Sequence, residues 1–89
     1  MPATADVSVV ITNYNTGPYL ERCVASIVAQ DLGGLRCEIV VVENASFVDQ
    51  EPHLAAVEAM GARVLRLPEN LGHGAGCNRG VAQTTGRCV

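Results

Sequence analysis

The sequence predicts a single α/β domain in which a mostly parallel sheet is covered by helices on both faces. Two uninterrupted apolar, β-branched runs, Val9–Ile11 and Ile39–Val42, are typical of parallel strands that are buried on both sides. The segment between them carries the apolar periodicity of a helix that packs on a sheet. Because 48% of the residues are hydrophobic and only 3% are aromatic, a core of Val, Leu, Ile and Ala is expected, which suits packed α/β layers.

The first half of the chain is expected to form a strand, a helix and a second strand. The first strand covers about Val7 to Asn13, and the second covers about Cys37 to Glu43. The helix between them runs from Pro18 to about Gln30, since proline suits the first helical position. Its predicted inner face consists of residues that recur at intervals of three and four: Leu20, Cys23, Val24, Ile27 and Val28.

The second half is expected to add a helix, a strand and a helix. They are predicted at about Pro52 to Met60, at Arg63 to Leu67, and from near Gly74 or Gly76 to Thr85. Gly61 suits the position just after the second helix. Arg87 to Val89 would then begin a fourth strand, so this β-α-β-α-β-α domain of residues 1–89 is expected to be truncated at residue 89. The open edge of the first strand would favour a homo-oligomer.

Composition argues against several classes of function. The net charge is −3 and the basic residues, all Arg, are scattered, so nucleic acid is not expected as a partner. No apolar run approaches the ~20 residues of a membrane span, and the first residues lack a signal-peptide pattern, so a cytoplasmic location is expected. The cysteines Cys23, Cys37, Cys77 and Cys88 form no C-x-x-C pair and are expected to be buried free thiols, with Cys77 as the possible exception because it lies in a predicted site loop.

Polar side chains follow both long strands, at the point where ligands of an open α/β sheet bind. Glu43 ends an apolar strand, so its carboxylate is expected at the rim of the crevice, either to accept hydrogen bonds from a ligand or as a solvated charge or helix cap. Tyr14 either stacks on a flat ligand or packs against the first helix. Thr12 and Asn13 point to opposite faces, and Asn15 either contacts the ligand or caps the helix.

A glycine-rich stretch, Gly72–Gly76, precedes the third predicted helix. Glycines allow close backbone approach, and a helix N-terminus favours anions. The spacing does not match the G-x-G-x-x-G fingerprint after a first strand, and the chain contains no Lys, which argues against a dinucleotide site and a Walker-type loop. Asn78 and Arg79 are expected to open the helix, where Arg79 either pairs with a phosphate group or forms a surface salt bridge.

Three blocks of sequence occur in the order found in a known enzyme family. They are Val-Ile-Thr-Asn-Tyr-Asn at 10–15, Val-Val-Val-Glu-Asn-Ala-Ser at 40–46, and Glu-Asn-Leu-Gly at 69–72 with Gly-Cys-Asn-Arg-Gly at 76–80. Together they resemble the start of the family 2 glycosyltransferases. The resemblance implies the N-terminal, nucleotide-binding half of a Rossmann-like GT-A fold. It also implies an inverting transfer of a sugar from a nucleotide-diphosphate donor to an acceptor hydroxyl, as in polysaccharide or cell-wall biosynthesis.

The resemblance further implies which residues bind the nucleotide. In similar enzymes the position of Glu43 is usually Asp and contacts the base, and the position of His73 is often aromatic. The implied nucleotide-binding residues are Thr12, Asn13, Tyr14, Asn15, Glu43, Asn44, Ser46, Asn70, Gly72, Asn78 and Arg79. No residue of this chain is expected to act as the catalytic base or as a metal ligand.

The remaining machinery is expected outside the chain. The resemblance implies a divalent metal, magnesium or manganese, and a carboxylate base, both beyond residue 89, so the chain alone is expected to be inactive. UDP- or dTDP-linked donors are expected in preference to GDP-linked ones, and the expected acceptor is a sugar or a lipid-linked molecule. The full-length protein is expected to be cytoplasmic or peripheral at the membrane. The alternative is a non-catalytic, doubly wound α/β module that binds a nucleotide or another protein.

Overall fold

The computed structural model describes residues 5–30, 33–46 and 49–85, which form alternating strands and helices. The elements are β1 (Val7–Asn13), α1 (Gly17–Val28), β2 (Cys37–Glu43), α2 (Glu51–Ala59), β3 (Arg63–Arg66) and α3 (Gly72–Val81). The predicted β-α-β-α-β-α order is confirmed. The expected fourth strand and Cys88 lie outside the described residues. In the described ranges, every helix is too short or too polar to cross a bilayer.

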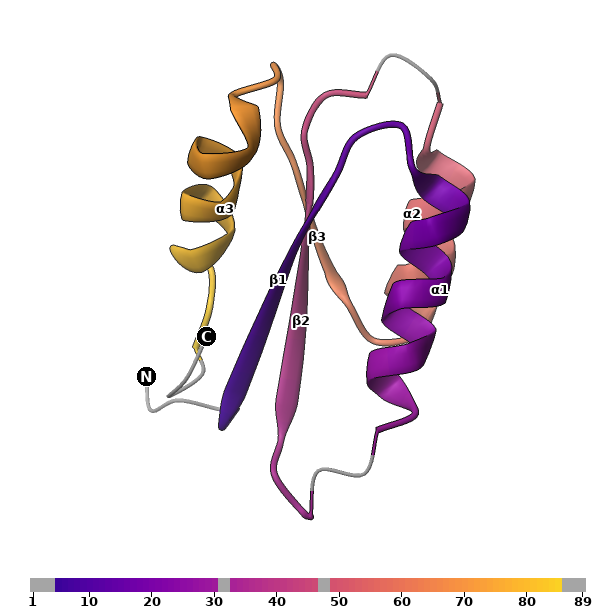
Figure 1. Cartoon of the computed structure of the whole chain (residues 1–89), viewed down its shortest axis with the longest axis vertical. Coiled ribbons are helices and arrows are strands. Elements are labelled where there is room, and N and C mark those ends of the chain that lie inside the picture. The colour runs from indigo at the N-terminus through magenta and orange to yellow at the C-terminus, as the bar shows by residue number, and fades with distance from the viewer. Residues whose placement is uncertain (1–4, 31–32, 47–48, 86–89) are drawn as a thin grey trace.

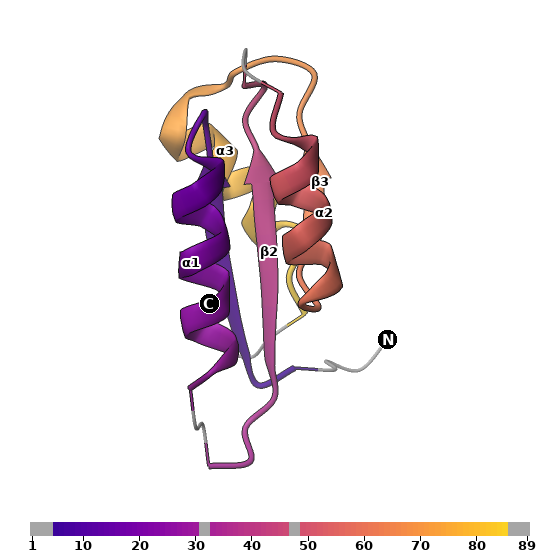
Figure 2. The ribbon, with the colours of Figure 1, turned by 90° about the vertical axis from the view of Figure 1, so that its right-hand side faces the viewer.

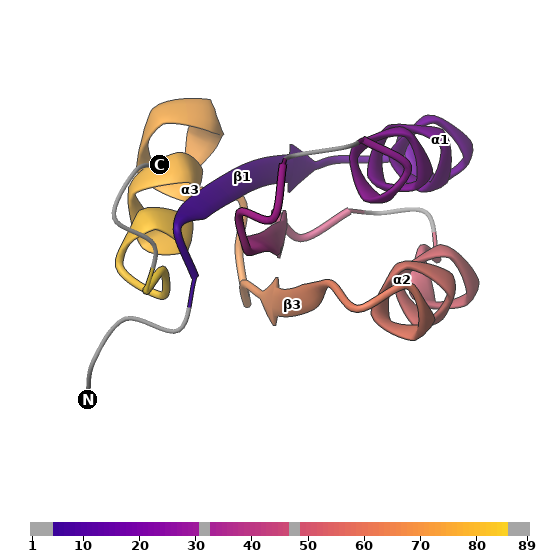
Figure 3. The same cartoon turned by 90° about the horizontal axis from the view of Figure 1, so that it is seen from below.

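The sheet has the strand order β1-β2-β3, and both pairs are parallel. Asn13 at the end of β1 is in register with Glu43 of β2, which is in register with Arg66 of β3. Helices α1 and α2 cover one face of the sheet and α3 covers the other (Figure 1), as the view from below also shows (Figure 3). Because the strands are parallel, their carboxyl ends all lie at the same end of the sheet. This end lies between the start of α1 and the start of α3.

The main apolar core lies between the sheet and the neighbouring helices α1 and α2, which face the viewer in Figure 2. Its central members are at most 6% exposed: Leu20, Val24, Ile39, Val41, Leu54 and Val57. The predicted stripe of α1 is wider than the buried one, because Cys23 is exposed and Val28 is 54% exposed. The expectation of buried thiols is also wrong for Cys37, which is only partly buried, and Cys77, the possible exception, is partly buried as well.

The opposite face of the sheet is covered by α3, which approaches it on glycines. The helix begins at Gly72, before both of the predicted starts, Gly74 and Gly76. A methyl group added at Gly80 would lie 2.5 Å from Val10 Cγ1 and 2.7 Å from Val42 Cγ2. Only a residue without a side chain fits there. The absence of side chains at Gly76 and Gly80 thus lets the backbone of this helix pack closely on the sheet, although glycines count against a helix in the sequence.

Candidate functional site

Most of the predicted site residues lie close together at the strand ends, but the side chain of Asn13 lies in the protein interior. Its side chain is fully buried on the α1–α2 face. The amide Nδ2 donates to Gln50 Oε1 at 3.2 Å, and Oδ1 accepts a hydrogen bond of 2.7 Å from the Thr16 hydroxyl. Thr16 and Gln50 are the residues that precede α1 and α2. Asn13 therefore fixes the starts of both helices relative to the sheet, and Thr16, not Asn15, occupies the cap position of α1.

Glu43 anchors a short hydrogen-bond chain that joins the loops after β1 and β2. The Ser46 hydroxyl donates to Glu43 Oε1 at 2.7 Å and accepts from the backbone N–H of Asn15 at 2.9 Å. Glu43 is 7% exposed, and strand alternation places it on the same face as Val41. The expectation that its carboxylate emerges at the rim of the crevice is therefore wrong, and Glu43 lies on the opposite face from Thr12. Among the described residues, Ser46 is the only hydrogen-bond partner of this carboxylate.

The two loops that leave β1 and β2 turn with the same backbone device. Asn15 has a φ of 58° and Ala45 a φ of 56°, so each left-handed residue lies two positions after the end of its strand. Asparagine tolerates this conformation, whereas for alanine it costs roughly 1–2 kcal/mol. The left-handed turn at Ala45 directs Ser46 back toward Glu43 and Asn15. The unfavourable backbone conformation of Ala45 thus accompanies hydrogen bonds of Ser46 that hold the two loops at a fixed spacing.

Asn44 ties the end of β2 to the start of α3. It is 4% exposed, its Oδ1 accepts from the Leu71 N–H at 3.0 Å, and its Nδ2 donates to the Gly72 carbonyl at 3.2 Å. Asn70 contributes a second contact, since its Oδ1 accepts from the Gly72 N–H at 2.7 Å. The first N–H groups of a helix lack intrahelical partners, and these two amides supply them. Asn44 and Asn70 therefore position the N-terminus of α3 at the strand ends.

Thr12 faces the other side of the sheet and contacts a residue outside the predicted set. Its Oγ1 lies 3.0 Å from Nδ1 of the exposed His73, and His73 Nε2 lies 3.5 Å from Cys77 Sγ. The alternation of Thr12 and Asn13 is confirmed, with Asn13 on the α1–α2 face. The sequence resemblance singles out the position of His73, but no local pattern links it to Thr12, which lies 61 residues earlier.

Asn78 and Arg79 do not open α3, as the sequence analysis expected. The helix starts at Gly72, and Arg79 belongs to its last turn. Asn78 lies two residues from both Gly76 and Gly80, which are buried against the sheet, so it projects from the opposite side of the helix. The structure therefore does not bring these two side chains to the strand ends. Tyr14 does lie there, in the loop after β1, and is 44% exposed.

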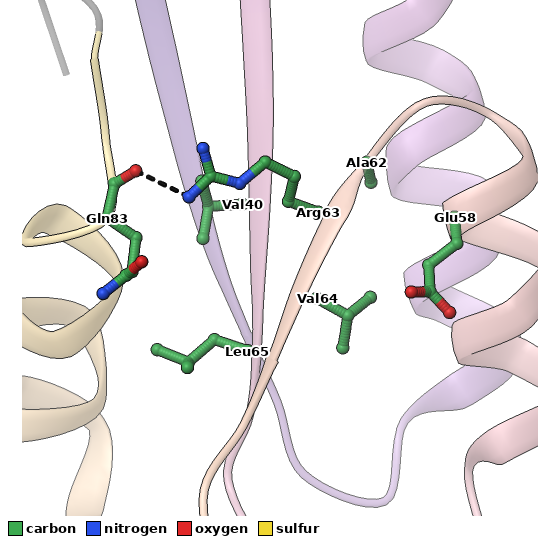
Figure 4. A pocket seen from close by; sticks show the side chains of 7 residues that line it. All are labelled: Val40, Glu58, Ala62, Arg63, Val64, Leu65 and Gln83. Atoms are coloured by element: carbon green, nitrogen blue, oxygen red, sulfur yellow. Dashed lines mark hydrogen bonds between the residues drawn. The ribbon is translucent and has the colours of Figure 1, made fainter. Parts of the chain in front are cut away.

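Two hollows on the described residues have volumes near 350 Å³ each, and both lie away from the strand ends. The first flanks β3, where Arg63 donates to the Gln83 carbonyl at 2.8 Å (Figure 4). The second lies near the start of β2 and the ends of α1 and α2, between Val28, Leu35 and Met60. Neither hollow contains a predicted site residue. In the described ranges, no three His, Cys, Asp or Glu side chains converge as metal ligands would.

The comparisons with known proteins agree with the fold and with the motif blocks. The model of Glycosyl transferase family 2 matches residues 8–89. The chain is 34% identical over 85 residues to the succinoglycan biosynthesis protein ExoO of Rhizobium meliloti, covering 94% of this chain and 24% of that protein. It is 31% identical over 85 residues to an uncharacterized glycosyltransferase of Nostoc, covering 93% and 26%. The chain thus spans about a quarter of the length of these relatives.

Two solved structures share the fold with a TM-score of 0.79, each over 94% of this chain and 26% of its own. One is the mannosyltransferase PcManGT from Pyrobaculum calidifontis in complex with GDP-Man and Mn²⁺, at 22% identity, and the other is S. aureus TarS, at 25% identity. Both are matched over only a part of their length. The parallel sheet, the polar strand ends and the family match over residues 8–89 lead to one conclusion: this chain belongs to glycosyl transferase family 2.

Proposed function

We propose that this chain supplies the nucleotide-binding part of an inverting glycosyltransferase that uses a nucleoside diphosphate sugar. The observation that carries the proposal is the hydrogen-bond chain at the strand ends, in which Ser46 holds one oxygen of the Glu43 carboxylate. The other oxygen is the acceptor that we assign to an N–H of the base. Tyr14, exposed in the adjoining loop, supplies an aromatic face on which a base can stack.

We divide the predicted nucleotide-binding residues into two proposed roles. We assign direct ligand contact to Tyr14, which is exposed, to Thr12, which is partly exposed, and to the carboxylate of Glu43, although that residue is buried. We assign positioning roles to the residues whose side chains or backbone are held by other parts of the chain: Asn13, Asn15, Asn44, Ser46, Asn70 and Gly72. Asn78 and Arg79 remain a prediction from the family motif.

The chemical step needs groups that the described residues do not assemble. Inverting transfer requires a base that takes the proton of an acceptor hydroxyl, while the sugar passes through an oxocarbenium-like state. A divalent metal is expected from the family resemblance, and one structural neighbour is a complex with Mn²⁺, but the described residues do not fit a metal site. We therefore infer that these 89 residues bind and orient the donor and transfer no sugar alone. The acceptor is proposed to be a sugar or lipid-linked hydroxyl.

The proposal is tested by calorimetric titration of the chain with UDP, dTDP, GDP and NAD. The sequence favours UDP or dTDP, whereas one structural neighbour holds GDP-Man, so all three nucleoside diphosphates belong in the panel. We expect weak binding of at least one of them and no binding of NAD. Glu43→Gln should weaken that binding by ~1.5–3 kcal/mol, the range for hydrogen bonds to a charged group. Binding of NAD that equals or exceeds the others would overturn the proposal in favour of a different doubly wound module.

A further inference from the structure

We propose that His53 is a positioning residue of the nucleotide site, whose ring fixes the start of α1 and so fixes the loop of residues 14–16 that carries Tyr14. The inference rests on the proposed function and adds to it a residue that lies outside the predicted set. His53 is the third residue of α2, which lies beside α1 on the same face of the sheet (Figure 2). It acts through α1 and not through contact with the ligand.

The first argument is the close packing of the His53 ring on Gly17, the first residue of α1. Gly17 is buried, and a Cβ atom added to it would lie 2.7 Å from His53 Nε2 and nearer still to two carbons of the ring. Because the φ of Gly17 is not positive, its backbone conformation does not itself require glycine. The missing side chain leaves room for the ring, and the ring in turn limits how close the start of α1 comes to α2.

The second argument is that another residue of α1 holds the same ring. The Nδ1 atom of His53 contacts the carboxylate of Glu21, and both side chains are partly buried. Glu21 lies four residues after Gly17, so the two residues lie on the same face of α1, one turn apart. The ring therefore contacts α1 at two points, and a shift of the helix along its axis would break one of these contacts.

The third argument is that the first turn of α2 also holds the other end of the loop. Gln50, which precedes α2, accepts the His53 N–H at its carbonyl, at 2.9 Å, and accepts the Asn13 amide at its Oε1. Asn13 is the last residue of β1, and Gly17 is the first residue of α1. Contacts from one turn of α2 thus bracket the loop that joins them. Moving His53 should therefore move Tyr14, the ring that we assign to stacking on the base.

The test compares the nucleotide affinity of His53→Ala with that of Ile27→Val, using the nucleoside diphosphate of the panel that binds. Ile27 lies near the other end of α1 and packs against the core, so Ile27→Val lowers the stability without touching the loop. We expect His53→Ala to weaken binding roughly three- to tenfold, the range for the loss of an aromatic stacking contact, and Ile27→Val to change it less than about twofold. Urea unfolding of each variant verifies that it is folded during the titration.

Two conservative variants show which property of His53 matters. His53→Phe keeps a flat ring over Gly17 but loses the nitrogen that contacts Glu21, whereas His53→Gln keeps a polar group for Glu21 but has no ring. We expect His53→Phe to retain most of the affinity and His53→Gln to lose as much as His53→Ala. Equal affinities for the Phe and Gln variants would contradict the role of the ring.

Gly17→Ala is the reciprocal test. In the unchanged chain the added methyl group would collide with the ring, so the nucleotide should bind more weakly. In the double variant with His53→Ala the methyl group has room, and the affinity should be no lower than in His53→Ala alone. Two effects that simply multiply would show that the ring does not rest on Gly17, and the inference would be overturned.

A readout without ligand completes the test. In NMR spectra of the free chain, the backbone amide signals of Tyr14 and Thr16 should shift in His53→Ala and keep their positions in Ile27→Val. If no nucleoside diphosphate binds to the unchanged chain, the proposed function fails and the role of His53 in it fails too. If one binds, then unchanged affinity or unchanged Tyr14 and Thr16 signals in His53→Ala would overturn the positioning role, while the donor site would stand.

Discussion

The two faces of the sheet are covered in different ways. The face under α1 and α2 is packed with branched apolar side chains, and Leu54, Val24 and Val57 are completely buried there. The face under α3 is packed through the backbone of the helix, because Gly80 and Gly76 lie directly against the sheet. The apolar side chains on the first face separate the backbones of α1 and α2 from the sheet. The glycines on the second face let the backbone of α3 lie close to the strands.

This difference shows how the chain divides stability from ligand contact. Large side chains bury apolar area, and each fully buried Val or Leu contributes about 1.5–3 kcal/mol. Glycine contributes no side-chain area, but it lets the N-terminus of α3 lie beside the strand ends, where Asn44 bonds to Leu71 and Gly72. We infer that side-chain packing on the α1–α2 face mainly stabilises the sheet, whereas glycine packing on the α3 face places a helix N-terminus beside the strand ends.

The strongest test of this division is Leu54→Ala. Leu54 has no exposed surface and lies in the centre of the α1–α2 core, so its removal leaves a cavity. We expect a loss of ~2–5 kcal/mol in the free energy of unfolding, measured by urea denaturation. Leu35→Ala is the matched control, because Leu35 is 54% exposed, and its effect should stay within about 0.5 kcal/mol. Equal losses for the two variants would contradict the packing described.

The glycine face is tested by adding one methyl group at two positions of the same helix. Gly80→Ala places Cβ against Val10 and Val42, so we expect a loss of ~1–3 kcal/mol through overpacking. Gly74→Ala places Cβ where no atom lies within 4 Å, so the better helix propensity of alanine should stabilise the chain by up to ~1 kcal/mol. The same substitution should thus have opposite signs in thermal or urea unfolding. A gain at both positions would mean that α3 does not lie close to the sheet.

The two faces also differ in how far the sequence predicts them. The apolar runs predict β1 and β2 with the bounds that the structure has, Val7–Asn13 and Cys37–Glu43. Such apolar runs are expected to be buried, so their place in the sheet is easily predicted. The start of α3 is predicted too late, because helix propensities count Gly72 and Gly74 against a helix, and a single sequence does not reveal that the helix packs closely on the sheet.

The site is predicted by position but only in part by role. The polar residues that follow the strands lie close together, as the sequence indicates, because parallel strands have their carboxyl ends at the same end of the sheet. A sequence does not distinguish a polar side chain that contacts a ligand from one that satisfies backbone groups. Asn44 is buried in contacts of the second kind, and Asn13 is buried in hydrogen bonds to the side chains of Gln50 and Thr16. The contact of Thr12 with His73 depends on the placement of α3 and has no local sequence signal.

The smallest expected effect concerns Ser46, which lies in the loop after β2, near the strand ends. Ser46→Ala removes the hydrogen bond to Glu43 and the acceptor of the Asn15 N–H. Because Ser46 and Asn15 are both partly exposed, water can replace part of these contacts. We therefore expect a loss of only ~0.5–1.5 kcal/mol in the free energy of unfolding. Hydrogen exchange at the Asn15 N–H should become faster, because this N–H loses the Ser46 hydroxyl that accepts its hydrogen bond.

Two controls separate the role of the Ser46 hydroxyl from a general effect of the substitution. Ser46→Thr keeps a hydroxyl and should retain slow exchange at Asn15. Ser26→Ala changes an exposed serine of α1 and should leave that exchange unchanged. If Ser46→Ala leaves the Asn15 exchange rate as it is, the hydroxyl does not join the two loops. The positioning role assigned to Ser46 in the nucleotide site would then be withdrawn, while the packing of both faces would remain as described, since neither depends on this contact.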